Sequence, residues 1–333
     1  PRTPRRYAGG VVPFAAFMAE ALYGPEGFYS TGGSAGRRGD FITSVEVGPL
    51  FGAVVARFLD AEWDRLGRPD PFTVVDAGAG RGTLARAVAT AAPACAAAMR
   101  FVAVEVSASQ RASHPGGIES RDRMPDSPFV GVVVANELLD NLPFRLAVHD
   151  GAWREAFVAE LPDGRIVERL GAPLDPVPEV LPPGRLGARA PLVDAARDWV
   201  ESARRLVDAG TVVAFDYSVV LTAELAVRPW RDWLRTYRGH ERGGHYLADP
   251  GRQDITIEVP VDQLPEPDAA RTQAQWLRLH GIDELVEEGR RYWDEHAARP
   301  DVTAMRMRSR VSEAEALLDP AGLGGFTVLE WRS

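Results

Sequence analysis

The feature that most constrains this chain is a short apolar run that ends in an acid and passes into a turn with three glycines. The run is Val74-Val75-Asp76, the turn is Ala77-Gly78-Ala79-Gly80-Arg81-Gly82, and a helix is predicted from Thr83. Glycine has no Cβ, so the backbone can approach a ligand closely, and the first N–H groups of the following helix have no partner within that helix. The segment therefore predicts a strand, turn and helix that cradle a nucleotide-like cofactor.

The spacing of the glycines distinguishes between cofactors. A dinucleotide site requires Gly-x-Gly-x-x-Gly, but the position that would complete this pattern after Gly80 is Thr83, and glycine occurs one residue earlier, at Gly82. The pattern Asp-x-Gly-x-Gly-x-Gly resembles motif I of the class I S-adenosyl-L-methionine (SAM) methyltransferases. The alternative is that the glycines only let the strand and the helix pack tightly.

A second acid follows the next predicted strand. The run from Phe101 to Val104 ends at Glu105, and 105 − 76 = 29 residues separate Glu105 from Asp76, the length of one βαβ unit. In such a unit the acid after the second strand lies beside the glycine turn, where it can accept hydrogen bonds from both ribose hydroxyls. Glu105 is therefore the predicted ribose ligand, with a solvated glutamate at a strand end as the alternative.

Composition excludes several classes of protein. The 333 residues are 45% hydrophobic and 26% charged, and the apolar runs are far shorter than the roughly 18 residues that span a membrane. The net charge of −9 disfavours nucleic-acid and anionic-membrane binding, which require a basic face. One cysteine, Cys95, excludes a disulfide framework and a cysteine zinc site, and no metal site is expected at His240 and His245. The basic start lacks an apolar core, so we expect no secretory signal and a cytoplasmic protein.

Apolar periodicity predicts an α/β fold. Helices are expected within 11–23 and at 49–66, 83–92, from 110 and at 192–207, and strands at 72–75, 101–105, 117–120, 130–135, 211–216 and 326–331. Segments 144–149, 153–160 and 165–169 read as a hairpin-like insertion, followed by a surface loop at 173–191. The alternation predicts a doubly wound, mostly parallel sheet.

We expect six segments along the chain. They are an N-terminal helical extension with a lid loop (1–70), the SAM-binding half of a Rossmann-like core (71–150), an insertion (151–191), a core helix and strand (192–220), a substrate-side helical subdomain (221–310) and a C-terminal core strand (311–333).

Polar residues follow several of the predicted strands. Besides Asp76 and Glu105 these are Asn136-Glu137 and Asp216, and the carboxyl ends of parallel strands meet in one crevice where ligands bind. Glu137 and Asp140 lie three residues apart and would share a face if a helical turn formed. One acid could hold a cationic acceptor and another could take its proton. Alternatively, Asp140 caps a turn and Asn136 binds backbone groups.

Several blocks resemble the MidA-type SAM-dependent methyltransferases. They include Gly39-Asp40-Phe41-Ile42-Thr43, Asn136-Glu137-Leu138-Leu139-Asp140, Asp216-Tyr217 and Asp254-Ile255-Thr256, in the order of that family. The sequence departs from the family at Val45, Asn141 and Ser218, where proline, alanine and glycine are usual.

The resemblance implies a class I methyltransferase fold with an antiparallel last strand, SAM as cofactor and S-adenosyl-L-homocysteine as product. The implied cofactor-binding residues are Asp76, Gly78, Gly80, Gly82, Glu105, Glu119, Ser120 and Asn136, with Asp40 and Thr43 in a loop that could cover the cofactor. For that loop, hydrogen bonds that only satisfy its own backbone are an equal alternative. The implied catalytic residues are Glu137, Asp140 and Asp216.

Three functions follow. The first is protein arginine N-methylation, the activity of the family's mitochondrial member. The second is N- or O-methylation of a small metabolite or peptide, and the third is a SAM-binding assembly factor without turnover. The expected partner is thus a methyl acceptor, protein or small molecule, with no nucleic acid and no membrane, and a homodimer is left open.

Overall fold

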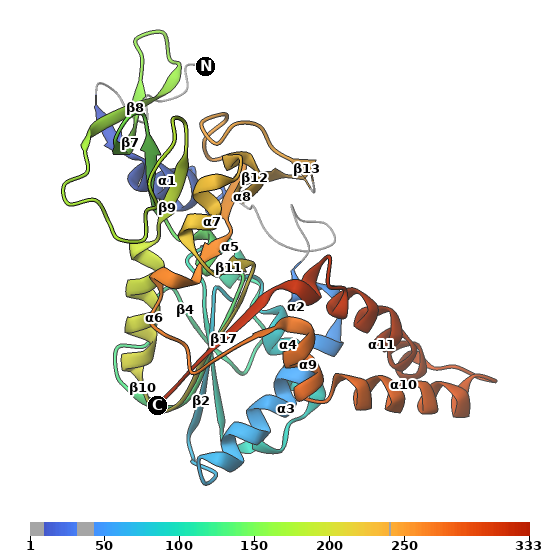
Figure 1. Cartoon of the computed structure of the whole chain (residues 1–333). Helices are drawn as coiled ribbons and strands as arrows, with labels where there is room; N and C mark the ends of the chain where they lie inside the picture. The colour runs from blue at the N-terminus through green and yellow to red at the C-terminus, as the bar shows by residue number, and fades with distance from the viewer. Residues whose placement is uncertain (1–9, 32–42, 240) are drawn as a thin grey trace. The chain divides into compact units, whose positions relative to one another are not determined.

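The computed structural model describes residues 10–31, 43–239 and 241–333, and these residues form two compact units. Each unit is built from three separate stretches of chain (Figure 1). The first unit contains residues 10–31, 139–201 and 218–266, and the second contains 43–138, 202–217 and 267–333.

A seven-stranded sheet forms the centre of the second unit. In sheet order its strands are Ala269–Thr272 (β16), Thr327–Arg332 (β17), Val207–Asp216 (β10), Phe129–Asn136 (β5), Phe72–Ala77 (β2), Met99–Val104 (β3) and Glu119–Arg121 (β4). Neighbouring strands from β10 to β4 are parallel, whereas β17 runs antiparallel to both β10 and β16. The predicted doubly wound sheet with an antiparallel last strand is confirmed.

The winding of this sheet reverses at β2. The chain passes from β2 outward to β3 and β4, and then returns to the other side of β2 with β5 and β10. The connections that leave β2 and β5 therefore diverge, and in open sheets of this kind ligands bind outside the carboxyl ends of the strands at this point. The glycine turn follows β2 at this point.

Helices complete the second unit. They are Ser44–Val47 (α2), Pro49–Arg65 (α3), Thr83–Ala91 (α4), Ala108–Arg111 (α5), Gln273–Leu279 (α9), Ile282–His296 (α10) and Val302–Leu318 (α11), with short 3-10 turns at Ala94–Ala97 (η1) and Leu323–Gly325 (η4). Local signals place several ends: Pro49 occupies the first turn of α3, and the Thr272 side chain caps α9 by accepting the N–H of Gln275.

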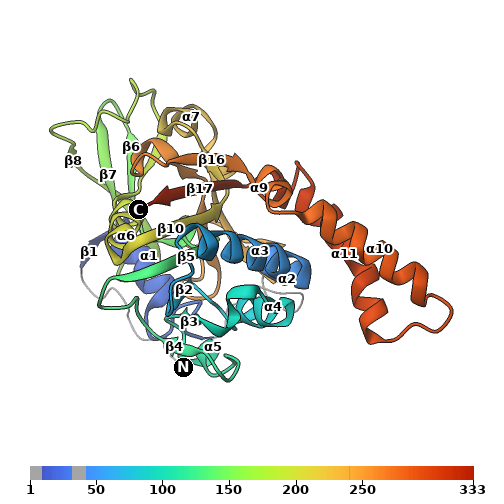
Figure 2. The same cartoon turned by 90° about the horizontal axis from the view of Figure 1, so that it is seen from below.

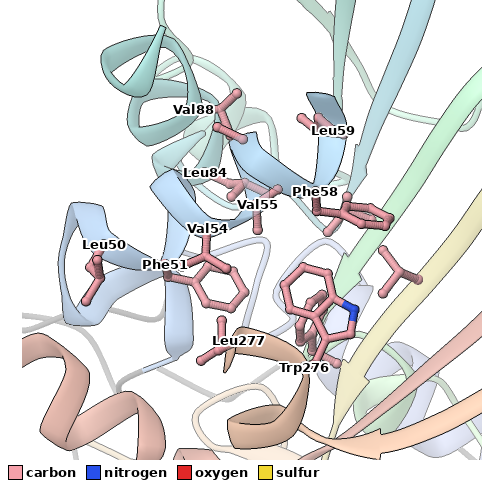
Figure 3. Packing of buried hydrophobic residues seen from close by; sticks show 14 of the residues in the cluster. Leu50, Phe51, Val54, Val55, Phe58, Leu59, Leu84, Val88, Trp276 and Leu277 are labelled. Carbon is pink, nitrogen blue, oxygen red and sulfur yellow. The ribbon is translucent and has the colours of Figure 1, made fainter. Parts of the chain in front are cut away.

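The apolar face of α3 forms much of the core of this unit. Figure 3 shows these side chains packed between α4 and α9. The aromatic rings of Phe58 and Trp276 lie 5.2 Å apart, and the ring of Trp276 also meets Phe215 of β10 at 4.8 Å. The labelled members of the cluster are Leu50, Phe51, Val54, Val55, Phe58, Leu59, Leu84, Val88, Trp276 and Leu277. This packing fixes α4, and with it the turn that precedes α4, against the sheet.

The first unit contains a five-stranded antiparallel sheet and two smaller ones. The large sheet is formed by Val11–Pro13 (β1), Arg145–His149 (β6), Trp153–Glu160 (β7), Ile166–Pro173 (β8) and Arg189–Leu192 (β9). The smaller sheets contain Leu234–Arg238 (β12), Glu241–Arg242 (β13) and Asp254–Ile257 (β14), and Ser218–Val219 (β11) with Val259–Pro260 (β15). The helices are Phe14–Tyr23 (α1), Thr222–Val227 (α7) and Trp230–Trp233 (α8), with 3-10 turns at Leu139–Asn141 (η2) and Val261–Gln263 (η3), and Asp194–Leu206 (α6) leads into β10.

Some predicted elements differ in detail. Residues Val11–Pro13 form a strand instead of the start of a helix, because they pair with β7. Residues 189–191 were predicted as the end of a loop and Leu192 as the start of a helix, but Arg189–Leu192 forms a strand that pairs with β6. The predicted insertion 151–191 lies within the first unit, while the predicted subdomain 221–310 is divided between the units after residue 266. Across the described ranges, no helix is both long enough and apolar enough to cross a membrane.

Candidate active site

The glycine turn has the left-handed backbone that its sequence implies. Gly78, Gly80 and Gly82 have φ angles of 74°, 54° and 76°, and α4 begins immediately afterwards at Thr83. A Cβ on Gly78 would lie 3.3 Å from Leu138, and one on Gly82 would lie 3.0 Å from Pro115. Both the backbone angles and the close neighbours favour glycine here, so the turn carries no Cβ at these three positions.

Glu105 lies directly after β3 and binds the turn. Its Oε2 accepts the N–H of Gly80 at 3.0 Å and its Oε1 accepts the N–H of Ser107 at 2.8 Å. Burial raises the pKa of Glu105, and the hydrogen bonds from these two N–H groups oppose the shift. The carboxylate therefore lies at the turn, on the β3 side of β2, where the ribose ligand is expected.

Asp76 is buried within β2, next to the turn. Burial, reinforced by the nearby charge of Glu105, raises the pKa of Asp76 to about 7. Its Oδ2 atom is buried and has no hydrogen-bond partner among the described residues. A buried acid with an open acceptor, beside bare backbone, fits a polar ligand with positive charge, and SAM is such a ligand.

His114 contributes to the turn and was not predicted. One ring nitrogen, Nε2, lies 2.9 Å from the carbonyl oxygen of Gly80, and Nδ1 lies 2.8 Å from the Ser120 hydroxyl. Ser120, a predicted cofactor residue, is thereby linked to the turn. Glu119 instead forms ion pairs with Arg100 and Arg121.

Glu137 follows β5 at the same edge of the sheet. Its φ of 52° lies in the left-handed region, which a residue with a Cβ rarely adopts, and its N–H donates to the carbonyl of Phe215 at 2.8 Å. Its Oε1 accepts the backbone N–H of Ser44 and the side-chain amide of Asn136, both at 3.2 Å. The carboxylate is thus held by α2 and by the end of β5. The Oδ1 of Asn136 is buried and has no hydrogen-bond partner within the described part of the chain.

The condition under which Glu137 and Asp140 would share a helical face, a helical turn that includes both residues, is not met. The 3-10 turn η2 begins only at Leu139, and the left-handed backbone of Glu137 excludes that residue from a right-handed turn. The two residues also belong to different compact units.

In the first unit, Asp140 is part of a buried polar network. Its Oδ2 accepts the hydroxyl of Thr256. The Asn141 amide next to it donates to Asp254 at 3.1 Å, and Asp254 also accepts the hydroxyl of Tyr29 at 3.1 Å. Burial, with the nearby charge of Asp140, raises the pKa of Asp254 to about 7. Tyr29 and Asp254 were not predicted as site residues, although Asp254 was part of a quoted family block.

The remaining predicted residues lie as follows. Asp216 is the buried last residue of β10, and its Oδ1 accepts the N–H of Tyr217 at 3.1 Å. Thr43 is buried and directly precedes α2. Asp40 lies outside the described residues. In the ranges that the structure covers, no group of histidine, cysteine and acidic side chains could hold a metal ion.

Comparison with known proteins identifies the family. Residues 54–281 match the family model described as "Putative S-adenosyl-L-methionine-dependent methyltransferase". A crystal structure from Burkholderia thailandensis, of a superfamily member described as a "likely methyl transferase" and bound to S-adenosyl-homocysteine, has 26% sequence identity and a TM-score of 0.78. The match covers 98% of this chain and 89% of that one. A second structure from the same organism, without that ligand in its description, gives a TM-score of 0.77.

Curated relatives point the same way. The protein arginine methyltransferase NDUFAF7 homolog, mitochondrial, of Drosophila melanogaster is 28% identical over 291 residues, which cover 75% of this chain and 65% of that protein. The human protein arginine methyltransferase NDUFAF7, mitochondrial, is 38% identical over 76 residues, 22% of this chain and 17% of that protein. The chain thus spans less than two thirds of the length of these relatives. The family model covers more than half of the chain, and the first Burkholderia structure matches its fold over 98% of the chain. SAM is the cofactor. The chain belongs to the MidA-type family of SAM-dependent methyltransferases.

Proposed function

We propose that this chain is a protein arginine N-methyltransferase. The observation that carries the proposal is the fixed carboxylate of Glu137, which lies after β5 at the edge of the sheet where the glycine turn follows β2. The side chain of the next residue, Leu138, reaches within 3.3 Å of the place where a Cβ on Gly78 would lie. The named activity of the Drosophila relative supports the same acceptor.

An arginine acceptor makes two demands on the protein. The guanidinium is protonated in water, so it requires a carboxylate partner, and it must lose a proton during or after transfer. When bound, SAM supplies a methyl group on a positively charged sulfur, and much of the rate enhancement then comes from placing the acceptor nitrogen in line. Glu137 meets the first demand, because two hydrogen bonds fix the direction of its carboxylate.

The left-handed backbone of Glu137 supports a functional role. A non-glycine residue in this region costs about 1–2 kcal/mol, and such strain is typical of functional sites. Asp216 ends β10 beside Glu137, since the Glu137 N–H donates to the neighbouring Phe215 carbonyl. We propose Asp216, which belongs to the same compact unit as Glu137, as the second acid at this edge.

The test is transfer of a labelled methyl group from SAM into a cell lysate, followed by acid hydrolysis of the labelled fraction. The proposal expects methylated arginine in one or a few protein bands. Label in small soluble molecules would instead identify a metabolite methyltransferase. If the chain bound S-adenosyl-homocysteine but no fraction of the lysate carried the label, it would be a SAM-binding assembly factor. Either of these two results contradicts the proposal.

Glu137→Gln tests the role of the carboxylate. The variant should bind S-adenosyl-homocysteine as the original chain does, and lose about 100-fold or more in methylation rate, because its neutral amide neither pairs with a guanidinium nor accepts its proton. Glu315→Gln, an exposed site on α11, serves as a control for the lost charge. Unchanged turnover of Glu137→Gln would remove Glu137 from the mechanism.

A further inference from the structure

The short helix α2 carries a carboxylate to the start of α4. Glu46 lies in α2, and its Oε1 accepts the hydroxyl of Thr83 at 2.6 Å. Thr83 is the first residue of α4 and directly follows Gly82. Both views show α2 beside α4 (Figures 1 and 2), and the two helices are in contact within the second unit. A second acid besides Glu105 is therefore attached to the cofactor turn, from a segment outside the strand ends.

The contacts of α2 define where Glu46 lies relative to the ends of the strands. Glu105 lies on the β3 side of β2, where it binds Gly80 and Ser107. The helix α2 binds Thr83, which follows β2, and through Ser44 it binds Glu137, which follows β5 on the other side. A cofactor whose ribose lies at Glu105 and whose reacting group faces the end of β5 extends across the turn towards α2.

The end of SAM remote from the adenosine is an amino acid with an α-ammonium group. An ammonium group inside a crevice requires a carboxylate or carbonyl partner. Among the described residues, no arginine or histidine forms an ion pair with Glu46. The carboxylate of Glu46 accepts a hydrogen bond from the Thr83 hydroxyl through Oε1. The carboxylate is thus fixed in position by a neutral hydroxyl, with its charge not paired to a cation within the described part of the chain.

We propose that Glu46 binds the α-ammonium group of the methionine part of SAM, with Thr83 as the residue that positions its carboxylate. This role depends on SAM as cofactor and is independent of the acceptor proposed above. The proposal gives the short helix α2 two roles. The backbone N–H of its first residue, Ser44, binds the catalytic candidate Glu137, and its Glu46 binds the amino-acid end of SAM.

The test measures binding by calorimetry, with no turnover required. Three probes are compared: S-adenosyl-homocysteine, its desamino analogue, which retains the carboxylate, and 5′-methylthioadenosine, which lacks the amino-acid part. Glu46→Gln should weaken S-adenosyl-homocysteine about 10- to 100-fold, since it removes a charge-assisted hydrogen bond. It should change the other two affinities by less than about twofold, because they lack the ammonium group.

Matched variants separate binding from support of the fold. Glu315→Gln removes the same charge from an exposed site of the same unit and should leave all three affinities unchanged. Glu46→Asp keeps the charge on a shorter side chain and should retain part of the affinity for S-adenosyl-homocysteine. This second variant tests the role of the charge even if Glu46→Gln folds poorly. Equal weakening of all three probes by Glu46→Gln would show that Glu46 only supports the turn, and an unchanged affinity for S-adenosyl-homocysteine would also overturn the proposal.

Discussion

Gly80 is the residue at which a side chain should separate cofactor binding from folding. It has a left-handed φ of 54°, and its N–H and carbonyl bind Glu105 and His114, so both of its polar backbone groups are already used to shape the turn. A Cβ at this position would lie 3.3 Å from the side-chain oxygen of Gln110, so a β-branched side chain would crowd the turn and force the backbone out of the left-handed region. We expect Gly80→Val to abolish S-adenosyl-homocysteine binding in calorimetry.

Gly67 provides the matched control for Gly80→Val. It follows the end of α3 with a φ of 78°, and a Cβ there would meet nothing within 4 Å. Gly67→Val therefore introduces comparable backbone strain, about 1–2 kcal/mol, without touching the cradle. It should lower the melting temperature and leave the affinity unchanged. Normal affinity in Gly80→Val, or lost affinity in Gly67→Val, would contradict the assignment of the cradle.

The sequence could predict those site residues whose position is marked by the residues next to them in the chain. Asp76 and Glu105 each end or follow an apolar run, and the structure has both beside the turn. Tyr29 and His114 had no such local signal. Tyr29 reaches Asp254 across 225 residues, and His114 reaches Gly80 across 34, so only the folded chain brings these groups together.

Among the elements, length and pattern decided which could be predicted. The helix α3 has 17 residues with a continuous apolar face, and its predicted bounds differ from the observed ones by one residue. Strands β11 and β15 have two residues each, too few to show an alternating pattern, and β16 has four at the edge of the sheet. The helix predicted through Val207 ends at Leu206, because Val207 already pairs with Phe129. Sheet pairing outweighs local helical preference at that point.

The junction between α3 and α11 depends on the buried acid Glu313. Its Oε2 accepts the N–H of Leu50 in the first turn of α3 at 2.8 Å, and its Oε1 accepts the Ser309 hydroxyl at 2.6 Å. Gly48 lies so close that a Cβ there would be 2.2 Å from the Glu313 carboxyl carbon. Glu313→Ala removes the partner of a helix N-terminus and leaves a cavity, so we expect a loss of about 1–3 kcal/mol in unfolding free energy, measured in urea.

The control for Glu313→Ala is Glu315→Ala, two residues along the same helix and exposed. It changes the same residue type without a buried partner and should alter the unfolding free energy by less than about 0.5 kcal/mol. If both variants were equally stable, the hydrogen bond to Leu50 would not hold α11 on α3.

At the scale of the whole molecule, the two compact units are interleaved along the chain. Sequence reasoning divides a chain at successive positions, but here β1 pairs with β7, and Tyr29 binds Asn141 and Asp254 within one unit. Pairings over such distances carry no signal in local periodicity, so contiguous segments were the natural expectation. Each unit is nevertheless stabilised by its own polar contacts; in the first, the partly buried side chain of Arg189 forms two hydrogen bonds with Glu168, at 2.6 and 2.8 Å.

Each unit contains a buried acid whose pKa is raised to about 7 and whose titration should make the stability of the whole molecule depend on pH. The pKa values of Asp76 in the second unit and Asp254 in the first are both raised to about 7, mainly by burial. The unfolded chain releases these protons near pH 4, whereas the folded chain keeps them until about pH 7. The contribution to stability is thus fully present below about pH 4 and is lost as the pH rises through 7, by at most about 4 kcal/mol for each acid.

We therefore expect the melting temperature of the cofactor-free protein to fall between pH 5 and pH 8. Asp76→Asn and Asp254→Asn should each reduce this fall, because an amide stays neutral at every pH. The two acids share no hydrogen-bond partner in the described residues, so the double variant should combine both reductions approximately additively. Asp294→Asn, at an exposed site on α10, should leave the slope as it is. A slope that survives unchanged in the double variant would contradict the raised pKa values of Asp76 and Asp254.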